Sequence, residues 1–450
     1  MKFKFSISSL ILMLLIIIVL FWYFNTLIIY NNNIDVFVIF TFCMILIISI
    51  INIFKDNRPF SLNKTYWYFN FIFFGMAPLA QYLENYSVWG YYISDFYYTK
   101  TNLLILVGNI VHMIIYKSDK KVYFENNTYT VSKKVETILT FIAMFCLILL
   151  LINVGFDNLF LRTENTTNFI ESTMFNTIIT CFLKVLPVYC FTIMYQSNNK
   201  INIKKVIVLL TILIANFPTS NTRFWMGAIF IGIILLVFVK SKSRNRIQDF
   251  ILLFTFTILF PITYFFHFYT IEDVLKNNLI YINIADSYLS VDYDAYSIFS
   301  RVIKYVDING IVLGSQLIGS ILFIIPRAIW PSKPQATGAF IASATNQKFT
   351  NISSPFMSEG FINFGLVGLV LFELVLAFIS SKFDNNYWSK NKNKYLKIVY
   401  PYLIGLLLFY ERGALHHAVV YTFCFLIPLI LMFLQKLFSN QRRKNLNGKL

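Results

Sequence analysis

The feature that most constrains the fold of this chain is a series of twelve apolar runs, most of them about as long as a membrane is thick. A helix that crosses the hydrocarbon core needs about 20 mostly apolar residues at about 1.5 Å per residue. Apolar residues make up 57% of the chain and charged residues only 13%, unlike the balance of soluble domains. We therefore predict an all-α, polytopic integral membrane protein with about twelve transmembrane helices in one domain, residues 1–450. The predicted spans lie near 5–24, 34–54, 65–81, 99–116, 136–154, 173–195, 205–218, 224–239, 247–268, 360–381, 398–411 and 416–438.

The positions of Lys and Arg predict how these helices are oriented, because positive charge is retained in short cytoplasmic loops. Basic residues gather in alternate loops, at Lys117–Lys134, Lys240–Arg246 and Lys382–Lys397, and at both ends of the chain. We predict that both termini are cytoplasmic. The net charge of +17 is scattered over every inner loop and not gathered on one domain, so it indicates membrane lipids, and not nucleic acid, as partners.

One loop is far longer than the others. It runs over residues 269–359, between the ninth and tenth spans, and we predict that it is external and periplasmic. Its apolar stretch, near 311–325, raises the question of a thirteenth span. A crossing there would force Lys382–Lys397 and the basic C-terminal tail outside, against the positive-inside bias. We therefore predict a re-entrant or interfacial helix for this stretch.

Five arginines lie in the predicted external segments, and guanidinium groups suit phosphate because their planar donors bind its oxygens in pairs. They are Arg162, Arg223, Arg301, Arg327 and Arg412. The spans before Arg223 and Arg412 are short for the hydrocarbon core, which predicts that both side chains lie below the outer surface in a protein-lined cavity. The alternative is that each arginine reaches the membrane interface or pairs with a neighbour such as Glu411.

Two other titratable side chains are candidates for proton transfer. Glu359 follows Ser-Pro-Phe-Met-Ser at the mouth of the tenth span, where the positive end of a helix favours a carboxylate. It is either a helix cap, or a general base or substrate anchor. His416 lies beside Arg412 and is a candidate acid, base or phosphate ligand, with a plain interfacial position as the alternative.

The sequence contains no set of His, Asp or Glu with metal-ligand spacing and no Walker loop. The five cysteines are odd in number and all fall in predicted spans, so they indicate neither a disulfide framework nor a metal site. We therefore predict no metal and no cofactor.

These features together resemble the Wzy-type oligosaccharide repeat-unit polymerases, which make O-antigen and capsule. The resemblance rests on the number of spans, the late external loop and three segments, Thr219–Arg223, the Pro-Arg-x-x-Trp-Pro-x-Lys-Pro turn at Pro326–Pro334, and Ser354–Gly365. It implies a membrane-embedded, metal-independent glycosyltransferase of the C type in the bacterial cytoplasmic (inner) membrane. The implied partners are undecaprenyl-pyrophosphate-linked donor and acceptor, with a chain-length regulator and a flippase beside them.

The resemblance also implies roles for single residues. Glu359 would be the base, and the other implied catalytic residues are Arg223, Arg327 and His416. The residues implied to bind pyrophosphate or sugar are Arg223, Arg301, Arg327, Trp330, Lys333 and Arg412.

Two alternatives remain open at this point. An O-antigen ligase has a similar layout and also places an Arg and a His externally, as Arg412 and His416 are placed here. A flippase for lipid-linked oligosaccharides would gather charge along its helices and have short loops. The concentration of charge in one long external loop favours the enzyme.

Overall fold

The computed structural model describes residues 7–26, 34–119, 122–123, 131–160, 174–197, 200–217, 221–238, 246–259, 284–347, 349–350, 352–390 and 394–428. Within these residues the chain is all-α, as predicted, and contains no strand. Most of the predicted spans coincide with helices to within a few residues. The second half of the span predicted at 247–268 and the end of the last one lie outside the described residues.

Six helices among the described residues are long and apolar enough to cross a membrane, which makes this a multi-pass membrane protein. They are α1 (Ile7–Thr26), α2 (Val36–Lys55), α5 (Asp95–Ile115), α6 (Lys133–Val154), α8 (Met174–Ser197) and α18 (Phe356–Trp388). Three shorter apolar helices add to them, in α10 (Arg223–Phe238), in α11 (Ile247–Phe254) with η4 (Thr255–Leu259), and at Leu415–Pro428. The full count of twelve spans stays a prediction.

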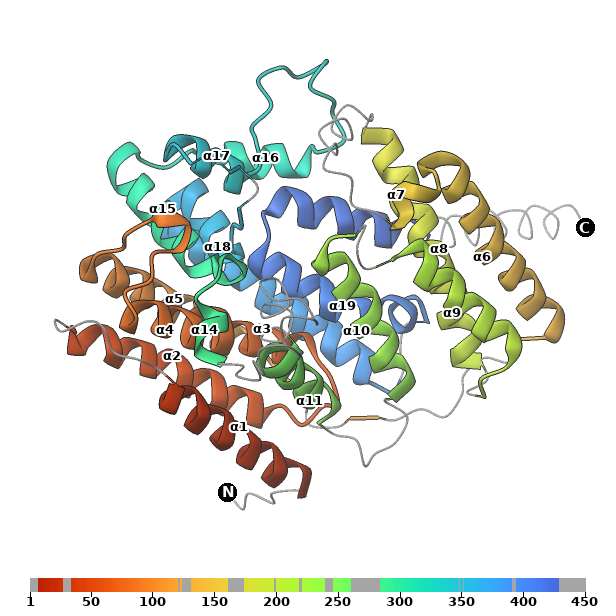
Figure 1. Cartoon of the computed structure of the whole chain (residues 1–450), viewed down its shortest axis with the longest axis horizontal. Helices are drawn as coiled ribbons and strands as arrows, with labels where there is room; N and C mark the ends of the chain where they lie inside the picture. The colour runs from red at the N-terminus through yellow and green to blue at the C-terminus, as the bar shows by residue number, and fades with distance from the viewer. Residues whose placement is uncertain are drawn as a thin grey trace, which may run out of the picture.

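The outermost helices present apolar side chains to their surroundings. On α1, Leu14 is 52% exposed and Phe21 is 71% exposed, and on α6, Phe141 is 66% exposed. Figure 1 shows α1 beside α2 at one flank of the molecule and α6 at the other. Contiguous exposed apolar surface of this kind is rare on soluble monomers and suits contact with lipid tails.

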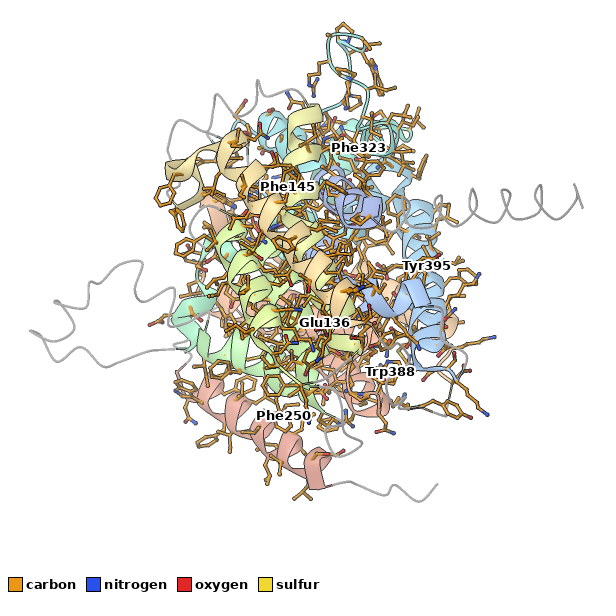
Figure 2. All side chains as sticks on the ribbon, turned by 90° about the vertical axis from the view of Figure 1, so that its right-hand side faces the viewer. Glu136, Phe145, Phe250, Phe323, Trp388 and Tyr395 are labelled. Carbon is orange, nitrogen blue, oxygen red and sulfur yellow. The ribbon has the colours of Figure 1, made fainter. Side chains whose placement is uncertain are left out.

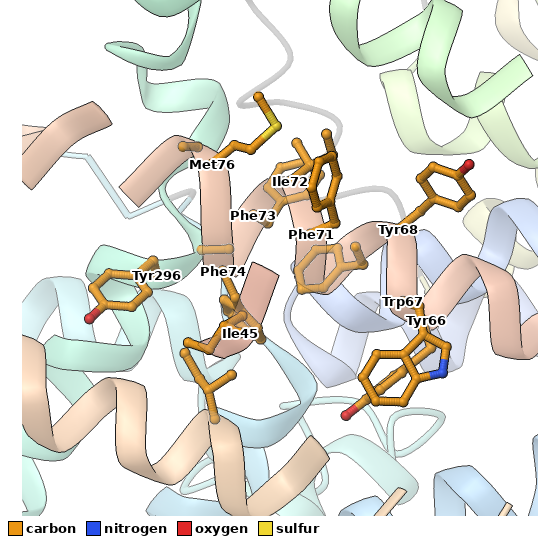
Figure 3. Close-up of a cluster of buried hydrophobic side chains, with 14 of the residues drawn as sticks. Ile45, Tyr66, Trp67, Tyr68, Phe71, Ile72, Phe73, Phe74, Met76 and Tyr296 are labelled. Carbon is orange, nitrogen blue, oxygen red and sulfur yellow. The ribbon is translucent and has the colours of Figure 1, made fainter. Parts of the chain in front are cut away.

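The third predicted span lies in the centre of the molecule and is continuous over three elements, α3 (Leu62–Phe69), the π-helical η1 (Asn70–Met76) and α4 (Ala77–Leu83). Almost every one of its side chains is buried. Figure 3 shows side chains of this segment from Tyr66 to Met76, with Ile45 from α2 and Tyr296 both drawn near Phe74. This helix contacts protein on all sides, which explains why its apolar residues form no single stripe.

The predicted span 360–381 lies within α18, a helical hairpin whose first turns form a short arm that folds back on a long arm. The chain leaves helical geometry at Phe364 and Gly365, where Gly365 has a φ of +63°, a conformation that glycine adopts at little cost. The short arm then lies against the long arm, since a Cβ placed on Gly368 would come within 2.0 Å of the Gly360 carbonyl oxygen. The rings of Phe356 and Phe372 are 5.1 Å apart, whereas a straight helix would separate these residues by about 24 Å.

Each end of the bundle brings together loops that are distant in sequence. At one end, the Arg58 guanidinium reaches Asp384, and the Arg246 guanidinium donates to the carbonyl of Ile53. These contacts join the segments after α2, before α11 and at the end of α18, all predicted to be cytoplasmic. At the opposite end, Trp89 of η2 (Val88–Gly90) donates to Asp294, which joins two predicted external segments.

The rest of the described external loop is made of short helices. They are α14 (Ile284–Tyr288), η5 (Val291–Tyr293), α15 (Ala295–Asn309), α16 (Ser315–Ile321) and α17 (Thr337–Ala344). The stretch predicted as one helix near 311–325 contains the seven residues of α16, and its placement at a membrane stays a prediction. The turn between α16 and α17 protrudes at the top of Figure 1. In Figure 2, Phe323 at the base of this turn lies near the upper end of the bundle, and Trp388 lies toward the lower end.

The remaining helices are α7 (Phe156–Phe160), α9 (Ile203–Ala215) and α19 (Lys394–Arg412). Helix α19 packs against α10, α3 and α18, whereas α7 packs against α6. Trp225 of α10 packs its ring 5.2 Å from that of Tyr421, which ties the start of α10 to the helix that follows α19. Helices α6, α8 and α9 pack against one another and lie together at the right of Figure 1.

Candidate functional site

The short arm of the α18 hairpin positions Glu359. This arm begins at Phe356 after Pro355, so Glu359 lies in its first turn, near the positive end of the helix. The side chain is only 1% exposed. Asn363, one turn later, donates from its amide to the Glu359 carbonyl and accepts from the backbone amide of Leu317. The tip of the hairpin is thereby attached to α16.

The Glu359 carboxylate is held by two neutral donors. The Thr337 hydroxyl, at the start of α17, donates to Oε2 at 2.6 Å. The backbone amide of Leu415, at the start of the last described helix, donates to Oε1 at 3.0 Å. Neither donor carries a charge, so the carboxylate is fixed in position and keeps its capacity to accept a proton.

Arg412, at the end of α19, is joined to the segment that precedes the short arm of α18. Its carbonyl accepts a hydrogen bond of 3.0 Å from the backbone amide of Ser354. Its guanidinium forms an ion pair of 3.1 Å with Asp294, which also accepts from the Trp89 indole at 3.0 Å. The side chain of Arg412 is 17% exposed, which places it in a largely protein-lined environment.

Arg301, on α15, is the most deeply buried of the described arginines in the predicted external loop. It is 1% exposed, donates from Nη2 to the Val88 carbonyl at 3.0 Å, and lies 4.3 Å above the Tyr91 ring. Its Nε and Nη1 have no hydrogen-bond partner among the described residues. Burial lowers the pKa of Arg301 to about 10, so it stays cationic at neutral pH with two donors unused.

The proline-rich turn is held by its own cations. Arg327 donates to the carbonyl of Lys333 at 2.6 Å and to that of Pro334 at 3.3 Å. The Lys333 ammonium donates back to the carbonyl of Phe323 at 2.7 Å. The Trp330 indole donates to the Ser332 hydroxyl. These contacts explain the conformation of the turn, in which Arg327 stays exposed and Lys333 is buried.

His416 and Arg223 flank this region. His416 lies beside the backbone of Gly319 and near Lys333 and Arg327, so it faces the turn. Because Leu415 binds Glu359, the start of this helix stands between the carboxylate and the turn. Arg223 is the first residue of α10, but its side chain lies outside the described residues, as does Arg162.

The predicted site residues and the side chains that contact them therefore fall into two neighbouring groups. The first group, which we call the carboxylate site, contains Glu359, Thr337, Arg412, Asp294 and Arg301. The second group, the cationic turn, contains Arg327, Trp330, Lys333 and His416. What the carboxylate site offers chemically is one positioned proton acceptor, Glu359, and two guanidinium groups, those of Arg412 and Arg301, that lie near Asp294.

Sequence reasoning missed several members of these groups. Asp294 and Thr337 were not singled out, because an Asp and a Thr in a polar loop carry no signal until the fold brings them to Arg412 and Glu359. Glu373 was also missed, although it stands alone in the apolar run of α18, where a carboxylate is costly and therefore informative. It lies on α18 with its Oε2 3.7 Å from Nδ1 of His112 on α5.

Comparisons with family models, with curated proteins and with solved structures found no match for this chain. Among the described residues, no three His, Cys, Asp or Glu side chains are arranged to hold a metal ion.

Proposed function

We propose that the protein polymerises undecaprenyl-pyrophosphate-linked oligosaccharide repeat units into surface polysaccharide, O-antigen or capsule, in the bacterial cytoplasmic membrane with both termini inside. The observation that carries the proposal is the carboxylate site, in which Glu359 is buried and held by Thr337 and Leu415 at the end of the bundle predicted to face outward. A buried carboxylate and a partly buried guanidinium are the groups that transfer of a glycan from a pyrophosphate requires.

The proposed reaction transfers the growing glycan from its lipid carrier to a hydroxyl of the next lipid-linked repeat unit. The hydroxyl oxygen attacks the anomeric carbon and the new C–O bond forms. The bond from that carbon to the pyrophosphate breaks, and the pyrophosphate leaves with its lipid and both bonding electrons. Glu359 accepts the proton of the hydroxyl. Arg412, with Arg223 and Arg327, stabilises the charge on the departing pyrophosphate.

The unused donors of Arg301 support the same chemistry. An arginine that is buried and still has two free N–H groups is ready to bind an anion, because its desolvation has already been compensated in part by the Val88 carbonyl and the Tyr91 ring. Lys333 and Trp330 have supporting roles in this proposal, through the conformation of the cationic turn that His416 faces.

A transporter, such as a lipid-linked oligosaccharide flippase, is the second candidate. It is favoured by the buried His112, Glu373 and Glu411 within the helices, since intramembrane charge marks transport paths. In the sequence, the concentration of charge in the external loop favoured an enzyme over a flippase. The charged side chains buried within the helices weaken that argument. An O-antigen ligase remains a third candidate on the layout of Arg412 and His416.

The test is the length distribution of surface polysaccharide in a strain that lacks the protein, complemented with wild type, Glu359→Gln or Arg327→Ala. Polymerisation predicts that single repeat units are displayed without a ladder, and that Glu359→Gln fails to restore it at normal membrane levels. The matched control is Asp119→Asn, an exposed acid at the opposite end, which restores the ladder. Glycan that accumulates inside indicates a flippase, and full-length polymer that stays on its carrier indicates a ligase; either result contradicts the proposal.

A further inference from the structure

Three ionisable side chains meet in the membrane core, away from the carboxylate site. His112 on α5, Glu373 on α18 and Glu411 on α19 are each 0% exposed. The Nδ1 of His112 and the Oε2 of Glu373 are 3.7 Å apart, too far for a hydrogen bond. Glu411 interacts with Glu373 and with Tyr66 of α3, whose ring stacks on that of His112 at 3.6 Å.

These groups lack partners to a degree that is unusual for buried polar atoms. Both carboxyl oxygens of Glu373, both of Glu411 and both ring nitrogens of His112 have no hydrogen-bond partner among the described residues. The Tyr66 hydroxyl lies beside Glu373, but it donates its proton to Asn109 at 2.7 Å. Buried polar groups are nearly always hydrogen-bonded, and a buried carboxylate without a partner is costly, so a ligand that removes the charge of these carboxyl groups is expected.

Electrostatics identifies that ligand. An ionised carboxylate without a partner in this environment costs several kcal/mol, and two neighbouring carboxylates also repel each other. The surrounding helices supply Tyr66, Asn109 and the apolar Met357, whose side chain lies against Gly108. Arg412, which follows Glu411 in the chain, is paired with Asp294. A proton on each carboxyl removes both the desolvation cost and the repulsion.

We propose that Glu373 and Glu411 form a proton-binding site in the membrane core, in which both carboxyl groups are protonated at neutral pH beside a neutral His112. This site is distinct from Glu359, and the proposal does not depend on the proposed glycan transfer. Within a membrane, a pair of carboxyls that can release and rebind protons is the chemical basis of proton-linked conformational change.

The test is infrared difference spectroscopy on the purified full-length protein in lipid nanodiscs at pH 7, since protonated carboxyl groups have a carbonyl stretch separate from that of carboxylates. The wild-type protein is compared with Glu373→Gln, Glu411→Gln and the double variant. Gln has the shape of a protonated Glu, so these variants are expected to fold. We expect each single substitution to remove part of the carboxyl band and the double substitution to remove both parts.

Spectra whose carboxyl band is the same in wild type and in the double variant would overturn the proposal, because both groups would then be ionised in the wild type. Asp119→Asn, a substitution of an exposed acid outside this cluster, is the control and leaves the band unchanged. Each sample is also measured with sodium chloride replaced by choline chloride. A carboxyl band that appears only without sodium assigns the site to a metal cation and also contradicts the proposal.

Discussion

The two ends of the helix bundle both bury charged side chains, but they treat them in opposite ways. At the end predicted to be cytoplasmic, which we call the inner end and whose opposite we call the outer end, Asp384 accepts from Tyr116 and Tyr400 and lies 3.4 Å from the Arg58 guanidinium. Lys64 and Asp249 form an ion pair of 2.7 Å with no exposure at all. At the outer end, Glu359 has only neutral donors and Arg301 has two donors without partners.

The difference teaches which end is structural and which end is available for chemistry. At the inner end, Arg58, Lys64 and Arg246 each have an anion within 3.5 Å, and these contacts tie α2, α3, α11 and α18 together. Breaking such a buried network is costly, because the remaining partner is left charged and unpaired. The outer end has charged groups without charged partners, and such groups are available to bind a charged ligand.

The largest effect is expected from Asp384→Ala. It removes the acceptor of two tyrosines and of the Leu62 and Asn63 amides, and it leaves Arg58 with one fewer anion. We expect a loss of about 3–5 kcal/mol in the free energy of unfolding, seen as a large fall in the thermal unfolding temperature of the purified protein. Asp119→Ala, on the exposed surface, is the control. A fall no larger than that of the control would mean that the inner network is not structural.

A smaller effect is expected from Gly368→Ala, which tests the α18 hairpin that carries Glu359. A methyl group there would come within 2.0 Å of the backbone oxygen of Gly360 and force the two arms apart. We expect a loss of about 1–3 kcal/mol, together with loss of the polysaccharide ladder. Gly227→Ala, at an open helical position in α10, is the matched control and is neutral or stabilising. Equal behaviour of the two variants would refute the hairpin.

Thr337→Val tests whether the position of the Glu359 carboxylate can be lost with little loss in the free energy of unfolding. The substitution removes the hydroxyl that donates to Glu359 and keeps the shape of the side chain. The free energy of unfolding should fall by about 1 kcal/mol, while polymer length falls strongly because the carboxylate is no longer held. Thr337→Ser keeps the hydroxyl and should restore the ladder. If Thr337→Ser is as defective as Thr337→Val, the methyl group and not the hydroxyl is what matters.

The smallest effect is expected from Lys100→Ala, which breaks the ion pair with Asp307 at the outer end. The two side chains are 33% and 31% exposed, so solvent screens their attraction. We expect a change of less than about 1 kcal/mol in the free energy of unfolding and a normal ladder. A change in the free energy of unfolding as large as that of Asp384→Ala would mean that exposed ion pairs stabilise the protein as much as buried networks do, which contradicts the comparison.

Much of the fold could be predicted from the sequence because lipid imposes a simple requirement. Each predicted span reflects the need to satisfy backbone groups within a helix, and α2, α5 and α6 follow the predicted ranges closely. The α18 hairpin could not be predicted in this way. Its two arms are both apolar, and the reversal depends on Gly365 and on the contact of Gly360 with Gly368, which an apolar run does not reveal.

The candidate site was predictable only in its charged members. Glu359, Arg301 and Arg412 stand out because charge is scarce in this chain, and the structure places them in one region. Asp294, Trp89 and Thr337 are ordinary loop residues, and their importance comes from contacts across more than 20 positions of sequence. Arg327 and Lys333 were predicted for the substrate, and the structure adds that they also hold the backbone of their own turn.

The sequence by itself determined the class of this protein, a bundle of apolar helices, because the cost of an unpaired backbone group in lipid is independent of which helices meet. The tertiary structure alone decided which polar side chains share an environment. Hydrogen bonds and ion pairs act over a few ångström, and Glu359 meets Leu415, and Glu373 meets His112, only after the helices have packed.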